Sequence, residues 1–254
     1  MQKNLVKEKI LSGGTAYGVF CNLYSPMIVE LIGHIGFDFA LIDAEHGPAG
    51  IESCEHMIRA ADSVGFPIFI RVAMNIRQNI LRYLDIGALG VMLPQVNTRA
   101  EAEAVVEAVK YPPQGRRGLG PVRAADYGLT IPLKEYTLNA NQEILVAIQV
   151  ETVAAVSNLD ELLAVEGIDV FFIGPADLSA SMGYVGQMNH PEVQAMIEKL
   201  VQRIRAAGRV AGTVAYTHEA LAKAKERGFY LIVHGVIAMM AKSGQEYLEI
   251  ARSS

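Results

Sequence analysis

Two short runs of almost wholly apolar residues, 144–150 and 168–173, constrain the fold of this chain more than any other feature. Each run has the length of a β-strand that is buried on both faces, as strands of a parallel sheet are. Residues 153–165 between them have the pattern of a helix, and Gly167 follows its expected end. The segment is therefore predicted to form a strand–helix–strand unit of a parallel sheet.

The same alternation continues along the whole chain. Strand candidates lie at residues 17–21, 37–42, 67–71, 89–93, 144–150, 168–173, 210–214 and 229–234. Helical patterns lie at residues 26–35, 51–64, 76–85, 99–110, 133–141, 153–165, 191–207, 217–227 and 236–251. We therefore expect a single (β/α)8 TIM-barrel domain over residues 1–254, with a further helix at its N-terminus. An open doubly wound sheet is the alternative, but no Gly-x-Gly-x-x-Gly follows the first strand.

Length and composition fit this architecture and exclude some functions. The chain has 254 residues, about the number that a (β/α)8 barrel needs, and 51% of them are hydrophobic. A net charge of −5 argues against a nucleic-acid partner. The chain has two cysteines, and no apolar run reaches the roughly 18 residues that span a membrane. We expect a cytoplasmic protein with neither a nucleic-acid nor a membrane partner.

Polar residues gather where the predicted strands end. In a (β/α)8 barrel the carboxyl ends of all strands meet at one mouth, which is where such enzymes carry their active sites. The residues expected there are Asp43, Glu45, His46, Arg71, Gln149, Glu151, Gly174, Asp177 and His234. The opposite strand ends carry little more than glycine, proline and apolar residues. This one-sided distribution predicts an enzyme.

Two of these residues, Glu151 and Asp177, follow neighbouring strands, so their carboxylates are expected side by side. Converging carboxylates repel unless something neutralises them, and Mg²⁺ commonly takes one or two protein carboxylates together with substrate oxygens. Each residue could instead be structural, Glu151 at a helix start and Asp177 in an acidic loop. No lysine lies at a predicted strand end, so a Schiff base is not expected and carbonyl chemistry would depend on a metal.

Roles for the other mouth residues follow from their chemistry. His46 is a natural general acid or base, because its ordinary pKa lies near neutrality, and Asp43 could orient its imidazole. Arg71 suits a carboxylate or a developing enolate, although it could equally pair with Asp43 or Glu45. The turn at residues 174–177 is expected to open a helix whose backbone N–H groups could bind a substrate carboxylate.

Four segments resemble motifs of the HpcH/HpaI aldolase family of metal-dependent class II pyruvate aldolases, and they occur in the family's order. They are residues 37–48 (FDFALIDAEHGP), 111–118 (YPPQGRRG), 149–152 (QVET) and 174–179 (GPADLS). The likeness runs from about Gly18 to Phe229 and looks closest to the enzymes for 4-hydroxy-2-oxoheptanedioate and 2-dehydro-3-deoxyglucarate. It implies reversible retro-aldol cleavage of a 4-hydroxy-2-oxo acid to pyruvate and an aldehyde.

The resemblance also implies roles at matching positions. Glu151 and Asp177 would hold one divalent cation, Mg²⁺, Mn²⁺ or Co²⁺, and pyruvate would also contact Gln149 and the backbone at Ala176. Arg71 would stabilise the enolate, and His46 would transfer the proton of the aldol hydroxyl.

The family further implies contributions between subunits. Asp85 matches an acid that reaches the active site of a neighbouring subunit. Members are usually homo-hexamers, arranged as a trimer of dimers, in which the last helix is exchanged. One departure is found at residues 233–237 (VHGVI), which lack the acid that is common after the last strand. It leaves the identity of the acceptor aldehyde open.

Two other functions remain open from the sequence. One is a lyase that acts on CoA thioesters, as in the related citrate-lyase β-type proteins. The other is a barrel that binds oxo acids without catalysis. Release of pyruvate with and without EDTA would distinguish these possibilities.

Overall fold

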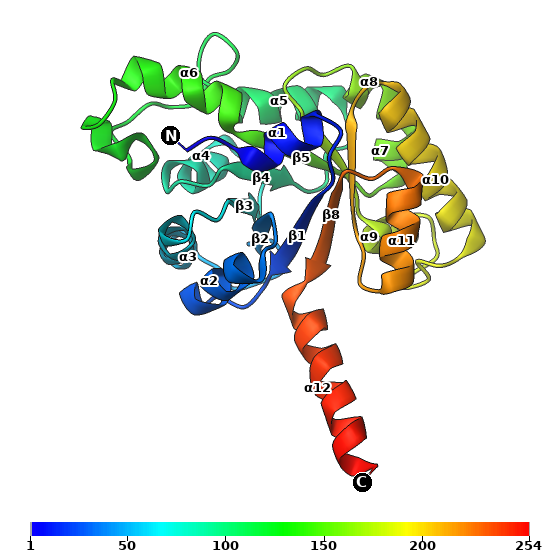
Figure 1. Ribbon diagram of the computed structural model, residues 1–254. Coiled ribbons are helices and arrows are strands. Elements are labelled where there is room, and N and C mark those ends of the chain that lie inside the picture. Colours follow the sequence, from blue (N-terminus) through cyan, green and yellow to red (C-terminus); the bar gives the residue numbers. More distant parts are fainter. Residues whose placement is uncertain (1, 254) are drawn as a thin grey trace.

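The computed structural model describes residues 2–253 and contains a closed barrel of eight parallel strands in sequence order (Figure 1). This confirms the predicted (β/α)8 architecture; the first and last residues of the expected domain lie outside the described residues. The strands are β1 (Ala16–Cys21), β2 (Phe39–Asp43), β3 (Ile68–Arg71), β4 (Gly90–Leu93), β5 (Leu145–Val150), β6 (Val170–Ile173), β7 (Val210–Val214) and β8 (Leu231–Gly235).

Helices surround the barrel and cover its outer face (Figure 1). Those before β5 are α1 (Leu5–Leu11), α2 (Pro26–Ile35), α3 (Ile51–Ser63), α4 (Arg77–Asp85), α5 (Arg99–Val109), the 3₁₀ helix η1 (Arg123–Gly128) and α6 (Leu133–Glu143). Those after β5 are α7 (Val153–Ser157), α8 (Leu159–Leu163), α9 (Pro175–Ser181), α10 (Pro191–Ala206), α11 (His218–Arg227) and α12 (Val236–Arg252). None of the helices that the structure describes is long and apolar enough to cross a membrane.

Large aromatic rings opposite glycines fill the inside of the barrel. A Cβ atom on Gly18 would lie 2.2 Å from the ring of Phe39, and one on Gly212 would lie 2.7 Å from the ring of Phe172. These rings therefore occupy space that any other residue at the two glycine positions would fill. Because side chains alternate along a strand, an inward Phe39 also places Asp43, four residues later on β2, on the inner side at the mouth.

Helix α1 closes the barrel at the amino ends of the strands. Its side chains Val6 and Ile10 belong to the same buried cluster as the aromatic residues of the interior. The side chain of Asn4 fixes the start of this helix, because its Nδ2 donates 2.9 Å hydrogen bonds to the carbonyls of Leu89 and Glu143. The interior is therefore filled from this end, and the mouth lies at the other.

The segment predicted as one helix at residues 153–165 consists of two short helices, α7 and α8. They meet at Asn158, whose backbone leaves the helical region with φ −96° and ψ 12°. Its Nδ2 donates a 2.8 Å hydrogen bond to the carbonyl of Asn97, in the loop after β4. Asparagine readily forms such side-chain contacts with the backbone in place of helix, which explains the break.

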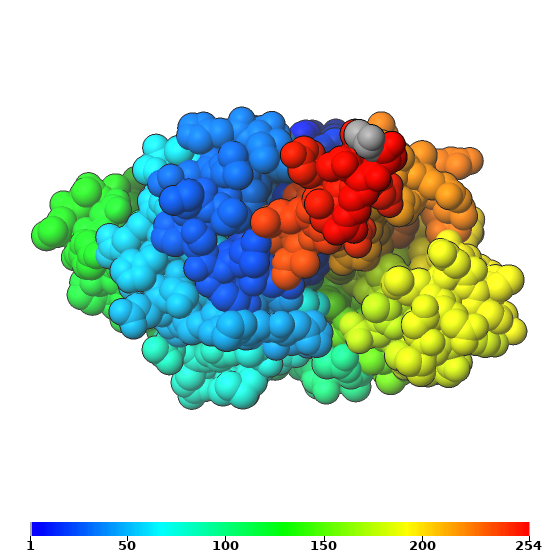
Figure 2. Space-filling model, turned by 90° about the horizontal axis from the view of Figure 1, so that it is seen from below, coloured from blue at the N-terminus to red at the C-terminus, as the bar shows by residue number. Residues whose placement is uncertain are grey.

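Helix α12 does not fold back against the barrel as the other helices do. It extends from the mouth into open space (Figure 1), and seen from the mouth side it stands in front of the barrel beside α2 (Figure 2). Of the residues that the structure describes in α12, only Val236 is buried. Its apolar side chains Ile237, Met240, Tyr247 and Leu248 are exposed.

Candidate active site

A cavity of about 510 Å³ opens at the carboxyl ends of the strands. The predicted site residues that line it are Asp43, His46, Arg71, Gln149, Gly174, Ala176 and Asp177. They come from β2, β3 and β5, from the turn into α3 and from the start of α9. The barrel thus brings together residues that are more than 130 positions apart in the sequence.

Arg71 is fixed at the centre of this cavity by Asp43. Its Nε and Nη2 donate hydrogen bonds of 2.9 and 2.7 Å to the two carboxylate oxygens of Asp43, and β2 and β3 pair these two residues directly. The guanidinium also lies 4.8 Å from the centre of the Phe20 ring. Burial acts to raise the pKa of Asp43, but the hydrogen bonds and charge of Arg71 outweigh it and hold this pKa below its ordinary value.

The sequence suggested that Asp43 orients the imidazole of His46, and the structure corrects this. Asp43 Oδ1 accepts 3.2 Å hydrogen bonds from the backbone N–H groups of Glu45 and His46, so it shapes the turn and not the ring. The nearest carboxylate to the imidazole is that of Glu45, with 3.8 Å between its Oε2 and Nε2 of His46. His46 is exposed at the rim, where it is free to meet a substrate.

Glu45 lies between the arginine and the histidine. Its Oε2 is 3.2 Å from Nη1 of Arg71, an ion pair that lacks the geometry of a hydrogen bond. Burial raises the pKa of Glu45 above its ordinary value, although the charge of Arg71 opposes this shift. Arg71 therefore forms a close ion pair with Asp43 and a looser one with Glu45.

Glu151 is almost fully buried beside the cavity. Its Oε1 accepts a 2.8 Å hydrogen bond from the backbone N–H of Gln95 and a 3.1 Å hydrogen bond from Nε2 of the same residue. Its Oε2 accepts a hydrogen bond from Nε2 of Gln149. Burial raises the pKa of Glu151 to about 7, and the negative charge of Asp177 adds to this shift.

These groups fit a hard divalent cation. Oε1 of Gln149 is buried and has no hydrogen-bond partner among residues 2–253, and the Gln149 side chain lies against Glu151. Gly174 leaves the approach open, because a Cβ atom there would lie 3.1 Å from Oε2 of Glu151. Within the described residues no group of three or more histidine, cysteine or acidic side chains could hold a metal. Two carboxylates completed by amide, substrate and water oxygens would match the ligand preference of Mg²⁺.

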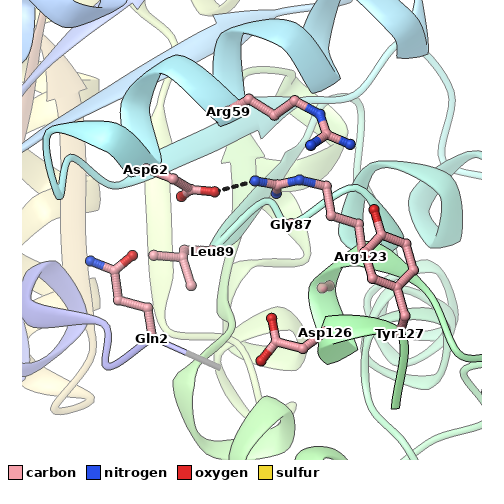
Figure 3. A pocket seen from close by; sticks show the side chains of 9 residues that line it. Gln2, Arg59, Asp62, Gly87, Leu89, Arg123, Asp126 and Tyr127 are labelled. Carbon is pink, nitrogen blue, oxygen red and sulfur yellow. Dashed lines mark hydrogen bonds and ion pairs between the residues drawn. The ribbon is translucent and has the colours of Figure 1, made fainter. Parts of the chain in front are cut away.

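Asp85 lies at the opposite end of the barrel from its own cavity. It ends α4, and its Oδ1 accepts a 2.8 Å hydrogen bond from Nη2 of the buried Arg117. The other arginines of the loop are also away from the mouth: Arg116 pairs with Glu107, and Arg123 with Asp62. Figure 3 shows Arg123 reaching Asp62 in a separate cavity of about 390 Å³. A role of Asp85 in a neighbouring subunit stays a prediction.

His234 was grouped with the mouth residues from its place at a strand end, and this was wrong. On β8 the inward positions are Val233, which belongs to the interior cluster, and Gly235, which lines the mouth cavity. The alternation of side chains therefore turns His234 outward. Its ring packs edge-on against Tyr216 at 5.6 Å and lines a different cavity, next to α12.

Three residues of the site were missed in the sequence. Gln95 follows a strand-ending proline, and nothing in the local pattern marks its contact with Glu151. Asn22 and Tyr216 line the mouth cavity from the turns after β1 and β7. Their position directly after predicted strands was a usable signal, since those turns also face the mouth.

Comparison with known proteins gives three findings. The profile of the HpcH/HpaI aldolase/citrate lyase family matches residues 16–242. A 2-keto-3-deoxy-L-rhamnonate aldolase from Klebsiella pneumoniae subsp. pneumoniae is 40% identical over 239 residues, 93% of this chain and 88% of that protein. The crystal structure of an HpcH/HpaI aldolase from Desulfitobacterium hafniense DCB-2 has a TM-score of 0.93 and 31% identity, covering 100% of this chain and 98% of that one.

A citrate synthase, SbnG, is also similar in structure, with a TM-score of 0.88 and 29% identity over 97% of both chains. Proteins with different named activities thus share this barrel. The residues of the mouth, and not the fold alone, must decide which reaction takes place.

Proposed function

Because the chain belongs to the HpcH/HpaI aldolase/citrate lyase family and is an aldolase, we propose that it releases pyruvate and an aldehyde from a 4-hydroxy-2-oxo acid such as 2-keto-3-deoxy-L-rhamnonate. The observation that carries this proposal is the meeting of Arg71, Gln149, Gly174 and Asp177 at one cavity, with Glu151 directly beside it. The reaction would remove the proton from the C4 hydroxyl, break the C3–C4 bond and leave the electron pair on the pyruvate enolate, which would then take up a proton at C3 to give pyruvate.

Each side chain has a role that its surroundings support. When bound by Glu151 and Asp177, a divalent cation (Mg²⁺, Mn²⁺ or Co²⁺) would polarise the keto group and favour the enolate. Arg71, held by Asp43, would stabilise negative charge on the enolate oxygen. His46 at the rim would accept the hydroxyl proton, and Ala176 and Gln149 would contact the pyruvate part.

The outer part of the cavity would hold the aldehyde. Met188, Tyr216, Ile237 and Ala238 line the cavity, and the side chains of the first three are exposed, as expected for its outer part. Cleavage of 2-keto-3-deoxy-L-rhamnonate between C3 and C4 gives lactaldehyde, which ends in a methyl group. An apolar wall suits that end better than it suits a carboxylate, which would be buried there without a partner.

We also propose that the protein is a homo-oligomer, a hexamer built as a trimer of dimers, with α12 exchanged between subunits. Helix α2 exposes a row of apolar side chains, Met27, Leu31 and Ile35, and α12 exposes its own. A cavity of about 680 Å³ between α12 and the outside of β1 and β8 could take an apolar helix face from another copy. Asp85, remote from its own cavity, would then serve the site of a neighbour. Both cysteines among the described residues are free and buried, which suits a cytoplasmic enzyme.

Pyruvate release from 2-keto-3-deoxy-L-rhamnonate, measured before and after treatment with EDTA and after adding back Mg²⁺ or Mn²⁺, tests the function. EDTA should abolish turnover and the added ion should restore it. Glu151→Ala and Asp177→Ala should remove metal-dependent turnover, whereas Glu161→Ala, an exposed acid on α8, should not change it.

Other results would contradict the proposal. Activity that survives EDTA would remove the cation from the mechanism. Turnover of a CoA thioester, with no cleavage of the oxo acid, would favour the citrate-lyase-like alternative. Binding of pyruvate without any turnover would favour a non-catalytic barrel.

A further inference from the structure

Gln95 has an unusual backbone conformation next to the proposed cation site. Its φ is +54°, in the left-handed region that residues other than glycine rarely adopt. Such a conformation is strained and persists only where the surroundings impose it, often at functional sites. The contacts that Gln95 makes must therefore outweigh the cost of this conformation.

The conformation directs two donors of Gln95 at a single acceptor. Its backbone N–H and its side-chain Nε2 lie 2.8 and 3.1 Å from Oε1 of Glu151. The other oxygen, Oε2, is beside Gly174, which lines the mouth cavity. Gln95 thus holds the carboxylate by Oε1, and Oε2, which accepts a hydrogen bond from Nε2 of Gln149, lies on the side of the cavity.

Neighbouring side chains keep this short loop in place. Nδ2 of Asn97 donates a 3.0 Å hydrogen bond to the carbonyl of Gln95, and the hydroxyl of Thr152 donates to Oδ1 of Asn97. Asn158 holds the carbonyl of Asn97, and Asn75 that of Pro94. The loop after β4 is therefore tied to the loop that follows β5, on which Glu151 lies. Contacts of this number can maintain a strained residue.

We propose that Gln95 is a positioning residue that orients the carboxylate of Glu151 for a divalent cation and thereby sets the affinity of the site. This inference rests on the proposed function, because it requires that Glu151 is a ligand. The physical reason is pre-organisation: a carboxylate already held by one oxygen loses little freedom when the other binds a cation. Partners of metal ligands typically change affinity by about 10- to 100-fold when they are removed.

The test is titration of the metal-free protein with Mn²⁺ by isothermal calorimetry, with melting temperatures of each protein alongside. Gln95→Met keeps the size of the side chain and the backbone N–H but removes the Nε2 donor. Gln95→Gly also keeps the backbone N–H and accepts the positive φ without strain. Gln142→Met, at an exposed glutamine of α6, is the matched control.

Both Gln95 variants should bind Mn²⁺ about 10-fold more weakly than the wild type, and the control should bind it as the wild type does. Gln95→Gly should melt no lower than the wild type, which separates orientation of the ligand from general stability. Wild-type affinity in both variants would overturn the proposal. So would weaker binding only in a variant that also melts lower, because that points to a folding role.

Failure of the proposed function would look different from failure of this inference. If Glu151→Ala binds Mn²⁺ as tightly as the wild type, or if the wild type binds none, Glu151 is not a ligand and both proposals fall. If Glu151→Ala abolishes binding while Gln95→Met and Gln95→Gly leave it intact, only the role of Gln95 is refuted.

Discussion

Asp43 organises the site without being placed to transfer a proton. It lies at the end of β2, accepts two hydrogen bonds from Arg71, and holds the turn that carries Glu45 and His46. Both of its oxygens are therefore engaged within the protein. A buried carboxylate in this position fixes the guanidinium that would meet the substrate, and its own lowered pKa keeps it ionised at neutral pH.

Replacing Asp43 by Asn should lower kcat/KM for oxo-acid cleavage by about 100-fold, the scale seen when a stabilising group at a developing oxyanion is disturbed. The amide offers one acceptor oxygen, so it cannot bind both Nε and Nη2 of Arg71. Steady-state pyruvate release measures the effect. Glu55→Gln, which breaks an ion pair with Arg59 on the surface of α3, is the control and should keep full activity. An active Asp43→Asn enzyme would show that Arg71 needs no such clamp.

Ile237 belongs to the wall that we assign to the aldehyde. Ile237→Ala should reduce the preference for lactaldehyde over glycolaldehyde in the aldol direction by about 10-fold, because the methyl group of lactaldehyde loses its apolar contact. Relative kcat/KM values for the two aldehydes give the measurement. Leu138→Ala, at an exposed leucine of α6, should leave the ratio unchanged. An unaltered ratio in Ile237→Ala would place the aldehyde elsewhere.

Site residues could be predicted from the sequence where their position along a strand is enough to place them at the mouth. They could not be predicted where the direction of the side chain decides whether it faces the cavity. Asp43, Arg71 and Gln149 were found because they lie at or next to the carboxyl ends of strands. His234 also ends a strand, but one residue of offset turns it outward, and the short run after Phe229 did not reveal which residue faces in. Gln95 was not predicted because its contact with Glu151 depends on a left-handed backbone conformation, which no local sequence pattern indicates.

At the scale of elements, α5 and α6 are joined by one buried amine. Lys110 follows α5, and its Nζ donates hydrogen bonds of 2.7 and 3.2 Å to the carbonyls of Asn141 and Ile144 at the end of α6. Burial, with smaller effects of nearby charges, lowers the pKa of Lys110 from 10.5 to about 8. A cation near the carboxyl end of a helix is favourable, yet its burial opposes the charge.

This pKa predicts how stability depends on pH. Between pH 8 and about 10 the unfolded chain still binds a proton at Lys110 that the folded chain has lost, so stability rises with pH. Relative to Lys110→Met, the wild type should gain up to about 3 kcal/mol of unfolding free energy across this range. Urea unfolding at several pH values measures the difference. Lys134→Met, at an exposed lysine of α6, should show no such trend. A constant difference for Lys110→Met would mean that the amine is charged in the fold throughout.

The order and type of elements could be predicted because each strand is a compact apolar run and each helix has its own period. A break inside a helix could not be predicted in this way. Residues 153–165 read as one helix, but Asn158 exchanges helical geometry for a bond to Asn97, a contact 61 positions away. A short stretch of sequence gives no sign of such a distant hydrogen-bond partner.

At the scale of the whole molecule, α12 extends away from the barrel, and few of its described residues are covered by the rest of the chain. Helices α12 and α2 are both visible from the mouth side (Figure 2), and the side chains of Met27, Leu31 and Ile35 on α2 are exposed. Isolated exposed apolar residues are common on protein surfaces, whereas two adjoining apolar elements are typical of an interface. This arrangement supports the proposed exchange of α12.

Leu31→Glu should disrupt the oligomer, because a charge would be buried against the apolar helix of another copy. Light scattering after size-exclusion chromatography should show the wild type as a hexamer and the variant as smaller species. Ala206→Glu, an added charge on the exposed end of α10, is the control and should stay assembled. A monomeric wild type would refute the exchange, and an intact Leu31→Glu hexamer would move the interface away from α2.

Helix α1 and the aromatic layers close one end of the barrel. Substrates and products can therefore pass only through the mouth. The product that is bound deepest must leave last, and Glu151 is buried whereas Met188 and Ile237 are exposed. Kinetics should then be ordered, with the aldehyde escaping before pyruvate. Pyruvate should inhibit cleavage competitively and the aldehyde noncompetitively, whereas the same pattern for both products would indicate a second exit.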